Sequence, residues 1–285
     1  MPRIDLHTHS TASDGTFSPT ELIIAAKEAG LVAISLTDHD TLAGLPEAIK
    51  AGEEYGIEVI PGCELSVKSS VGVLHIVGLW VDPYSKLLLE TFKSVRKKRG
   101  TRNIEVVKKL QKLGFEITLE EVHERAAGTV GRPHIARVLL DKKYVKSFDE
   151  AFRHYLGKKG KAYVPKQSLS PKEALKLLRS TGATSILAHP ALLSTNEEIL
   201  DEKVKELKDL GLDGIEVYYS SHTPDMTGIC KKLTHKYDLL ASGGSDFHGS
   251  VKPEIKLGRG SGKLFVHHSV LDDLKALRQS KGLQI

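Results

Sequence analysis

Short runs of aliphatic and β-branched residues alternate with helical patterns over residues 3–77, and the alternation resumes at residue 171. This order is typical of repeated βα units around a parallel sheet. At 285 residues the chain has room for one α/β barrel with an insertion. The expected strands are 3–6, 32–36, 58–60, 74–77, 184–187, 214–217, 239–241 and 264–266.

Local signals at the helix ends support this alternation. Ser18 is a candidate N-cap, Pro19 occupies the first helical position and Glu21 completes a capping box, so a helix is expected from here to Gly30. A second helix is expected from about Leu45 to Tyr55, before Gly56. Further helices are expected from residues 171, 197, 224 and 270.

The alternation stops after Asp82-Pro83, and residues 86–152 show helical patterns without a convincing strand. We therefore predict a barrel domain formed by residues 1–85 and 160–285, with a helical insertion at residues 86–159. A basic run from Lys93 to Arg102 lies in the insertion. Such a run is more often a solvated helix face than a binding site.

Composition limits the cellular setting. The chain has 41 Lys and Arg against 36 Asp and Glu, a net charge of +5 that mildly favours anionic ligands. No segment approaches the roughly 20 apolar residues that span a bilayer, and residues 2–5 do not resemble a signal peptide. Cys63 and Cys230 are too few for a disulfide framework. We expect a cytoplasmic protein without a membrane partner, and nothing implies an obligate protein partner.

Histidine and acidic residues follow the expected strands. His7 and His9 come directly after the first strand, and their spacing sends both imidazoles to the same side of an extended segment. In a βα barrel the strand ends that carry such residues converge on one face. Similar residues stand in or after the later strands: His39, Glu64, His75, His189, Asp246 and His248.

The expected cluster combines imidazole and carboxylate groups without a plausible cysteine. Such a ligand set favours Zn, Mn or Fe over soft-metal sites. Asp14, which follows the two histidines in a Ser-Asp-Gly sequence, is a further candidate ligand, although its type is also common in simple turns. The residues therefore predict a metal centre of more than one divalent ion.

Five separated motifs carry a family resemblance: HTHSTASDG, LTDHDT, GCELS, GRPHIA and SGGSDFHG. In this order they resemble the polymerase and histidinol phosphatase (PHP) family of metal-dependent phosphoesterases. The resemblance implies a distorted (β/α)7 TIM-like barrel with a centre of two to three divalent ions. It also implies three ligand sets: His7, His9, Glu64 and Asp246; Glu64, His75 and His134; and Asp14, His39 and His248.

Within the family the chain resembles the branch of nucleoside 3′,5′-bisphosphate phosphatases and a 5′-to-3′ exoribonuclease. The implied substrates are a phosphorylated nucleotide or a 5′-phosphorylated short RNA, hydrolysed by metal-activated water. Arg132 is a candidate phosphate clamp, with a helix-start salt bridge as its alternative role. The predicted catalytic residues are Glu64, Asp246, His189 and His222, and the two histidines are also predicted to bind substrate.

Three other functions remain open at this stage. An amidohydrolase acting on carbon–nitrogen bonds also begins with two histidines after its first strand, but the Thr37-Asp38-His39-Asp40 motif disfavours it. Histidinol-phosphate phosphatase is an alternative within the same family. A noncatalytic module that binds nucleic acid through the basic insertion is the third alternative.

Overall fold

The computed structural model describes residues 2–125, 130–165 and 168–285. The chain divides into two compact units, residues 1–90 with 169–285 and residues 91–168. The predicted boundaries at 85/86 and 159/160 lie five and nine residues before these divisions.

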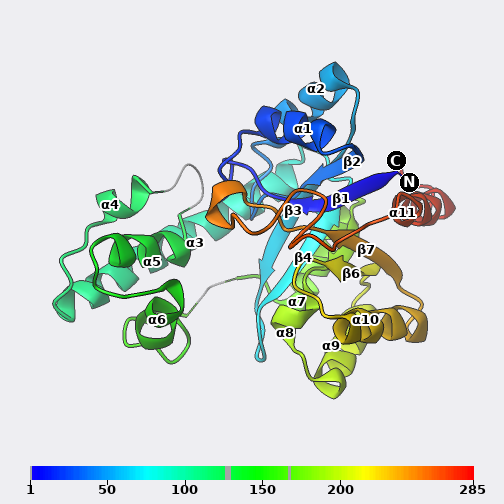
Figure 1. The fold of residues 1–285 in the computed structure, drawn as a ribbon. Coiled ribbons are helices and arrows are strands. Elements are labelled where there is room, and N and C mark those ends of the chain that lie inside the picture. The colour runs from blue at the N-terminus through cyan, green and yellow to red at the C-terminus, as the bar shows by residue number, and fades with distance from the viewer. Residues whose placement is uncertain (1, 126–129, 166–167) are drawn as a thin grey trace. The chain divides into compact units, whose positions relative to one another are not determined.

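The first unit contains a sheet of seven strands in sequential order (Figure 1). Its strands are β1 (Arg3–Thr8), β2 (Leu31–Leu36), β3 (Glu58–Val67), β4 (Leu74–Leu79), β5 (Thr184–Leu187), β6 (Gly214–Tyr219) and β7 (Leu240–Gly244). The sheet curls into a nearly closed barrel, because the segment after β7 bonds to β1. The amide of Asp246 donates to the carbonyl of His7 at 2.8 Å, and that of His9 donates to Phe247 at 2.9 Å.

The fourth strand departs from the expected parallel arrangement. β4 is antiparallel to both β3 and β5, whereas β1–β2, β2–β3, β5–β6 and β6–β7 are parallel pairs. The cause is the short link between Val67 and Leu74, because a parallel neighbour needs a crossover of a dozen or more residues. The beginning of β4, with His75, therefore lies at the same edge as the carboxyl ends of the parallel strands.

Helices follow the strands much as the sequence indicates. Helix α1 (Pro19–Glu28) has the expected capping box between Ser18 and Glu21, and α2 (Leu45–Tyr55) ends at Gly56 in the left-handed conformation, φ 67°. The others in this unit are α7 (Pro171–Ser180), α8 (Pro190–Leu193), α9 (Glu197–Asp209), α10 (Pro224–Lys236), the 3-10 turn η2 (Gly249–Val251) and α11 (Ser269–Ser280).

One end of the barrel is closed by apolar packing, and the histidines lie at the other end. Val270, Leu271 and Leu274 of α11 join Ile4 and other strand residues in one buried apolar cluster. Figure 1 shows α11 beside the beginning of β1. Burial of this apolar area stabilises the barrel, which leaves the opposite strand ends available for polar residues.

The expected strand at Leu264–Val266 is not formed. The carbonyl of Val266 accepts one hydrogen bond from the Ile4 amide at 3.0 Å, and Arg3 and His267 form an isolated antiparallel bridge. The turns before this segment explain why no ladder forms. Gly258, Gly260 and Gly262 all have positive φ and hold the chain in tight loops.

The second unit is helical in the residues that the structure describes. Helix α3 (Lys86–Lys112) runs into it, followed by α4 (Leu119–His123), α5 (Arg132–Asp141), α6 (Phe148–Ala151) and the π-helical turn η1 (Phe152–Leu156). These helices share their own core, which includes Leu110, Ile135 and Leu156. No helix among the described residues is long and apolar enough to cross a membrane.

Candidate metal centre

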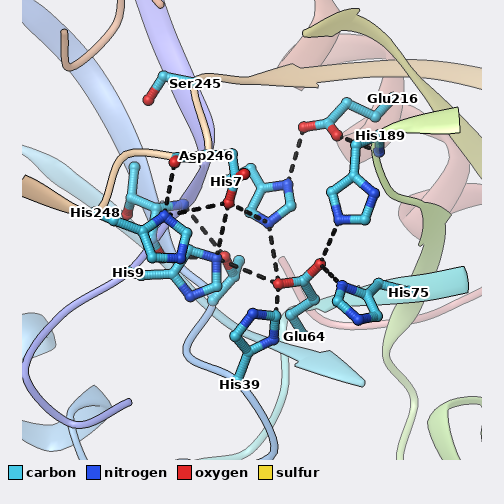
Figure 2. Close-up of polar contacts among 12 residues, drawn as sticks. His7, His9, His39, Glu64, His75, His189, Glu216, Ser245, Asp246 and His248 are labelled. Carbon is cyan, nitrogen blue, oxygen red and sulfur yellow. Dashed lines mark hydrogen bonds and ion pairs between the residues drawn. The ribbon is translucent and has the colours of Figure 1, made fainter. Parts of the chain in front are cut away.

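Glu64 lies at the centre of the polar cluster (Figure 2). It is fully buried in β3, and its Oε2 lies 3.3 Å from His7 Nε2, 3.2 Å from His9 Nε2 and 3.0 Å from His39 Nδ1. Its Oε1 lies 2.9 Å from His75 Nδ1 and 2.9 Å from His189 Nε2. One carboxylate thus contacts five imidazoles from four segments of the barrel.

The strand register explains how these groups meet. His7 lies inside β1, which runs two residues beyond its predicted end, and His9 has the same side-chain direction two residues later. Ser66 pairs with His75 across the antiparallel strands, so Glu64 and His75 are diagonal neighbours on one face. His39 forms a bridge with Glu64 just after β2.

A second carboxylate completes the set around His7 and His9. Asp246 Oδ1 lies 3.3 Å from His9 Nε2 and 3.6 Å from His7 Nε2. Asp246 has φ 55°, in the left-handed region that Asp tolerates better than most residues. This conformation follows directly after Gly244-Ser245 and places the side chain at the barrel end.

Asp14 lies near the outer side of the cluster. Its Oδ1 is 3.4 Å from His248 Nε2 and 3.8 Å from His9 Nδ1, while its Oδ2 is 3.9 Å from His39 Nε2. Asp38 fixes the loop that carries it, because its carboxylate accepts hydrogen bonds from the Ser10 amide at 2.8 Å and the Ser13 hydroxyl at 2.5 Å. Asp14 is thereby held as part of the cluster by an ordered loop.

The side chains form three groups whose ligand atoms lie within 4.8 Å of one another. Eight of the nine predicted metal ligands belong to them. The groups are His7, His9, Glu64 and Asp246; His39, Glu64 and His75; and His9, Asp14, His39 and His248.

The ninth predicted ligand, His134, lies in the helical unit. It is in the first turn of α5, where its Nδ1 accepts a hydrogen bond from the Gly131 amide at 3.0 Å. Arg132 begins the same helix and donates from Nη1 to the Leu156 carbonyl at 2.9 Å. The metal role of His134 and the substrate role of Arg132 stay predictions.

Buried atoms without partners show that the cluster fits a cation. Among the described residues, His7 Nε2, His9 Nε2 and Glu64 Oε2 are buried and have no hydrogen-bond partner, although the two nitrogens lie 3.3 and 3.2 Å from the oxygen. These atoms converge without pairing, and unsatisfied buried polar groups of this kind are costly. Imidazole nitrogens and carboxylate oxygens are together suited to Zn, Mn or Fe.

The electrostatics of His75, Glu64 and Asp246 favour the forms that bind metal, whereas Glu216 and Glu64 raise the pKa of His7 against the effect of burial. Burial lowers the pKa of His75 to about 3, so its imidazole is neutral at ordinary pH. Burial alone would raise the pKa of Glu64, but His39, His75 and His7 hold it well below its usual range. Likewise, His248 and Lys252 keep the pKa of Asp246 low against the effect of burial.

Three residues outside the predicted set hold the ligands. Glu216 in β6 accepts from His7 Nδ1 at 3.0 Å and from the backbone amide of His189 at 2.6 Å. Tyr219 donates its hydroxyl to Asp246 Oδ2 at 3.0 Å, and Lys252 Nζ lies 2.8 Å from the same oxygen. Their spacing in sequence gives no metal-ligand signal, but Glu216 and Tyr219 do stand near the end of a predicted strand.

The two predicted substrate histidines lie beside this centre. His189 contacts Glu64, and His222 packs edge-on against Tyr219 with ring centroids 5.3 Å apart. His222 Nδ1 lies 3.0 Å from the Val217 carbonyl oxygen, which can only accept a hydrogen bond, so Nδ1 is the donor. Its Nε2 is buried without a hydrogen-bond partner among the described residues.

We expect Glu216→Gln to weaken metal binding about 10- to 100-fold, the usual effect of losing a carboxylate that orients a ligating histidine. The amide keeps the size of Glu216 but cannot accept from both His7 and the His189 amide with two oxygens. Metal affinity can be measured by competition with a chelator. Glu198→Gln, at an exposed position, is the matched control. Equal affinity in both variants would contradict the orienting role.

Comparison with known proteins agrees with the geometry of the site. The model of the PHP domain family matches residues 5–241. A 5′-3′ exoribonuclease of Haemophilus influenzae is 36% identical over 86% of this chain and 90% of its own length. A 3′,5′-nucleoside bisphosphate phosphatase of Chromobacterium violaceum is 33% identical over 87% and 88%.

Solved structures show the same likeness. A protein of Bifidobacterium adolescentis, assigned as a metal-dependent phosphoesterase, superposes with a TM-score of 0.84. The two proteins are 30% identical, and the superposition covers 96% of each chain. The similarity thus extends over both the barrel and the helical unit of this chain.

Proposed function

This chain belongs to the PHP family of metal-dependent phosphoesterases, and we propose that it removes the 3′-phosphate from nucleoside 3′,5′-bisphosphates. The observation that carries the proposal is the Glu64-centred cluster, which offers ligand atoms for two to three divalent ions. The relatives named for bisphosphate and RNA hydrolysis support the choice of a nucleotide substrate. A 5′-phosphorylated short RNA is a second candidate substrate of the same site.

The ligand groups define which residues would hold the metal ions. His7, His9, Glu64 and Asp246 form the most deeply buried group. When bound, divalent ions supply Lewis acidity toward phosphate oxygens and lower the pKa of a coordinated water. Mn, Zn and Fe all suit these ligands.

His222 is suited to bind a hydroxyl group of the substrate. With Nδ1 donating to Val217, its neutral ring presents Nε2 as an acceptor. Burial also lowers the pKa of His222, which favours the neutral ring over the imidazolium. We therefore place His222 in substrate binding, as an acceptor for a ribose hydroxyl, more readily than in proton donation.

His189 is the better candidate to move a proton toward the leaving oxygen. Its Nε2 contacts Glu64, and its Nδ1 is buried without a hydrogen-bond partner among the described residues. The residue has φ 31°, a conformation that is strained for a side chain other than glycine and is typical of functional positions. Glu216 holds this backbone in place through the His189 amide.

Phosphate release with Mn or Zn added tests the proposal. We expect kcat/KM for adenosine 3′,5′-bisphosphate to exceed that for adenosine 3′- or 5′-monophosphate by about tenfold or more, since a second anionic group adds charge-assisted contacts. Preferential turnover of histidinol phosphate would contradict the proposal and identify the enzyme as a histidinol-phosphate phosphatase. Turnover of a cyclic amide, or RNA binding without turnover, would favour the two remaining alternatives.

A further inference from the structure

A buried carboxylate in β1 connects three segments of the barrel unit. Asp5 is fully buried, and its Oδ1 accepts hydrogen bonds from the backbone amides of Ser245 at 2.8 Å and His7 at 3.3 Å. Its Oδ2 accepts from the Ser245 hydroxyl at 2.5 Å and from the Gly258 amide at 2.8 Å. Asp5 belongs to none of the three ligand groups among the described residues. Its carboxylate instead holds backbone that leads to them.

Two of these partners stand at the ends of the loop that carries metal ligands. Ser245 comes directly before Asp246 (Figure 2), and Gly258 lies at the other end of the same loop. Both ends are buried, whereas residues 250–256 are exposed or half-buried. Because a loop with few buried contacts opens easily, the bonds at its two ends decide how firmly it is held.

The third partner connects this loop to the first strand. Asp5 accepts from the amide of His7, and the His7 carbonyl in turn accepts from the Asp246 amide at 2.8 Å. His7 and Asp246 belong to the same ligand group. The backbones that carry these two ligands are therefore fixed by their own hydrogen bond and by the carboxylate that both segments share.

We propose that Asp5 is a positioning residue for the metal centre, because it holds both ends of the loop 245–258. It thereby places Asp246 and His248 beside the ligands of β1. Groups that orient ligands affect metal affinity although they do not contact the metal. The proposal concerns the metal centre alone, so it does not depend on which phosphate ester the enzyme hydrolyses.

The donors around Asp5 require a carboxylate, which accepts through both oxygens. Asparagine at this position keeps one oxygen and turns its NH₂ group toward the other donors. In one orientation the NH₂ group faces the Gly258 amide, and in the other it faces the amides of Ser245 and His7. Both orientations oppose two donors, so Asp5→Asn releases at least one end of the loop.

Binding of Mn²⁺ to Asp5→Asn tests the proposal. We expect the affinity, measured by competition with a chelator, to fall about 10- to 100-fold, the usual effect of losing a residue that orients a ligand. Turnover should fall at limiting metal and recover in excess metal, because every ligand is still present. The absorption bands of bound Co²⁺, which report coordination geometry, should also change.

Asp213→Asn is the matched control, because Asp213 makes the same pair of contacts to a serine away from the metal centre. Its Oδ2 accepts from the amide and the hydroxyl of Ser185, both at 2.8 Å, and it stands directly before β6. We expect this variant to have a lower Tm, with the Mn²⁺ affinity and the Co²⁺ spectrum of the unaltered protein.

A lower Tm of Asp5→Asn with unaltered Mn²⁺ affinity and Co²⁺ spectrum would overturn the proposal. If this variant does not fold, Ser245→Ala replaces it, since it removes the hydroxyl donor and keeps the backbone amides. We expect Ser245→Ala to weaken Mn²⁺ binding about 3- to 10-fold, in the range for one hydrogen bond, and unchanged affinity there would equally overturn the proposal. An enzyme without bisphosphate turnover would remove the proposed function, while the metal-binding measurements would still decide on Asp5.

Discussion

Glu64→Gln should reduce kcat/KM by about 10³-fold or more, because it removes several kcal/mol of transition-state stabilisation by the metal ions. Each ~1.4 kcal/mol of activation free energy corresponds to a factor of ten in rate. Glu64 belongs to two of the three ligand groups, so one change affects more than one ion. The amide has nearly the same volume as the carboxylate but lacks its charge. Bound metal, measured by elemental analysis, should fall by at least one ion per chain.

Thermal unfolding shows whether this loss comes from the metal centre. Metal ions that bind only the folded chain raise Tm by mass action. We therefore expect a chelator to lower Tm of the unaltered protein more than that of Glu64→Gln. Glu58→Gln is the control, because Glu58 lies in the same strand but is exposed and paired with Lys275. Full metal content in Glu64→Gln would remove Glu64 from the centre.

Local chemistry made much of the barrel predictable from sequence. Ser18 and Glu21 form the capping box that their spacing indicated, and Gly56 adopts the left-handed conformation after α2. Such features depend on neighbouring residues alone. The convergence of His7, His39 and Asp246 was also predictable, because the ends of parallel strands meet at one edge of a sheet.

Features that depend on tertiary pairing were not predictable in the same way. The antiparallel direction of β4 follows from its short link to β3, and it brings His75 into the cluster from the beginning of a strand. Glu216 orients His7 over a separation of 209 residues, which no local pattern records. The misassigned strand near Val266 had the right composition, but its one bond to β1 does not continue into a ladder.

Asp246→Asn should lower kcat/KM by about 10³-fold, similar to the loss of a ligand at Glu64. Oδ2 of Asp246 accepts from the Tyr219 hydroxyl at 3.0 Å and faces Lys252 Nζ at 2.8 Å, while Oδ1 belongs to the group with His7 and His9. An amide nitrogen at either position is unfavourable. It meets two donors on one side, or it takes the place of a metal ligand on the other.

The choice of asparagine separates this effect from backbone strain, because Asn tolerates the positive φ of residue 246 as Asp does. Tyr219→Phe removes only one donor to Oδ2, and burial keeps the pKa of Tyr219 well above its usual value, so the hydroxyl is a donor at all working pH. We therefore expect a loss of about tenfold for Tyr219→Phe, in the range for residues that orient a ligand. Steady-state kinetics at saturating metal measure both changes. Equal losses in the two variants would show that Asp246 acts through its contact with Tyr219 and not as a metal ligand.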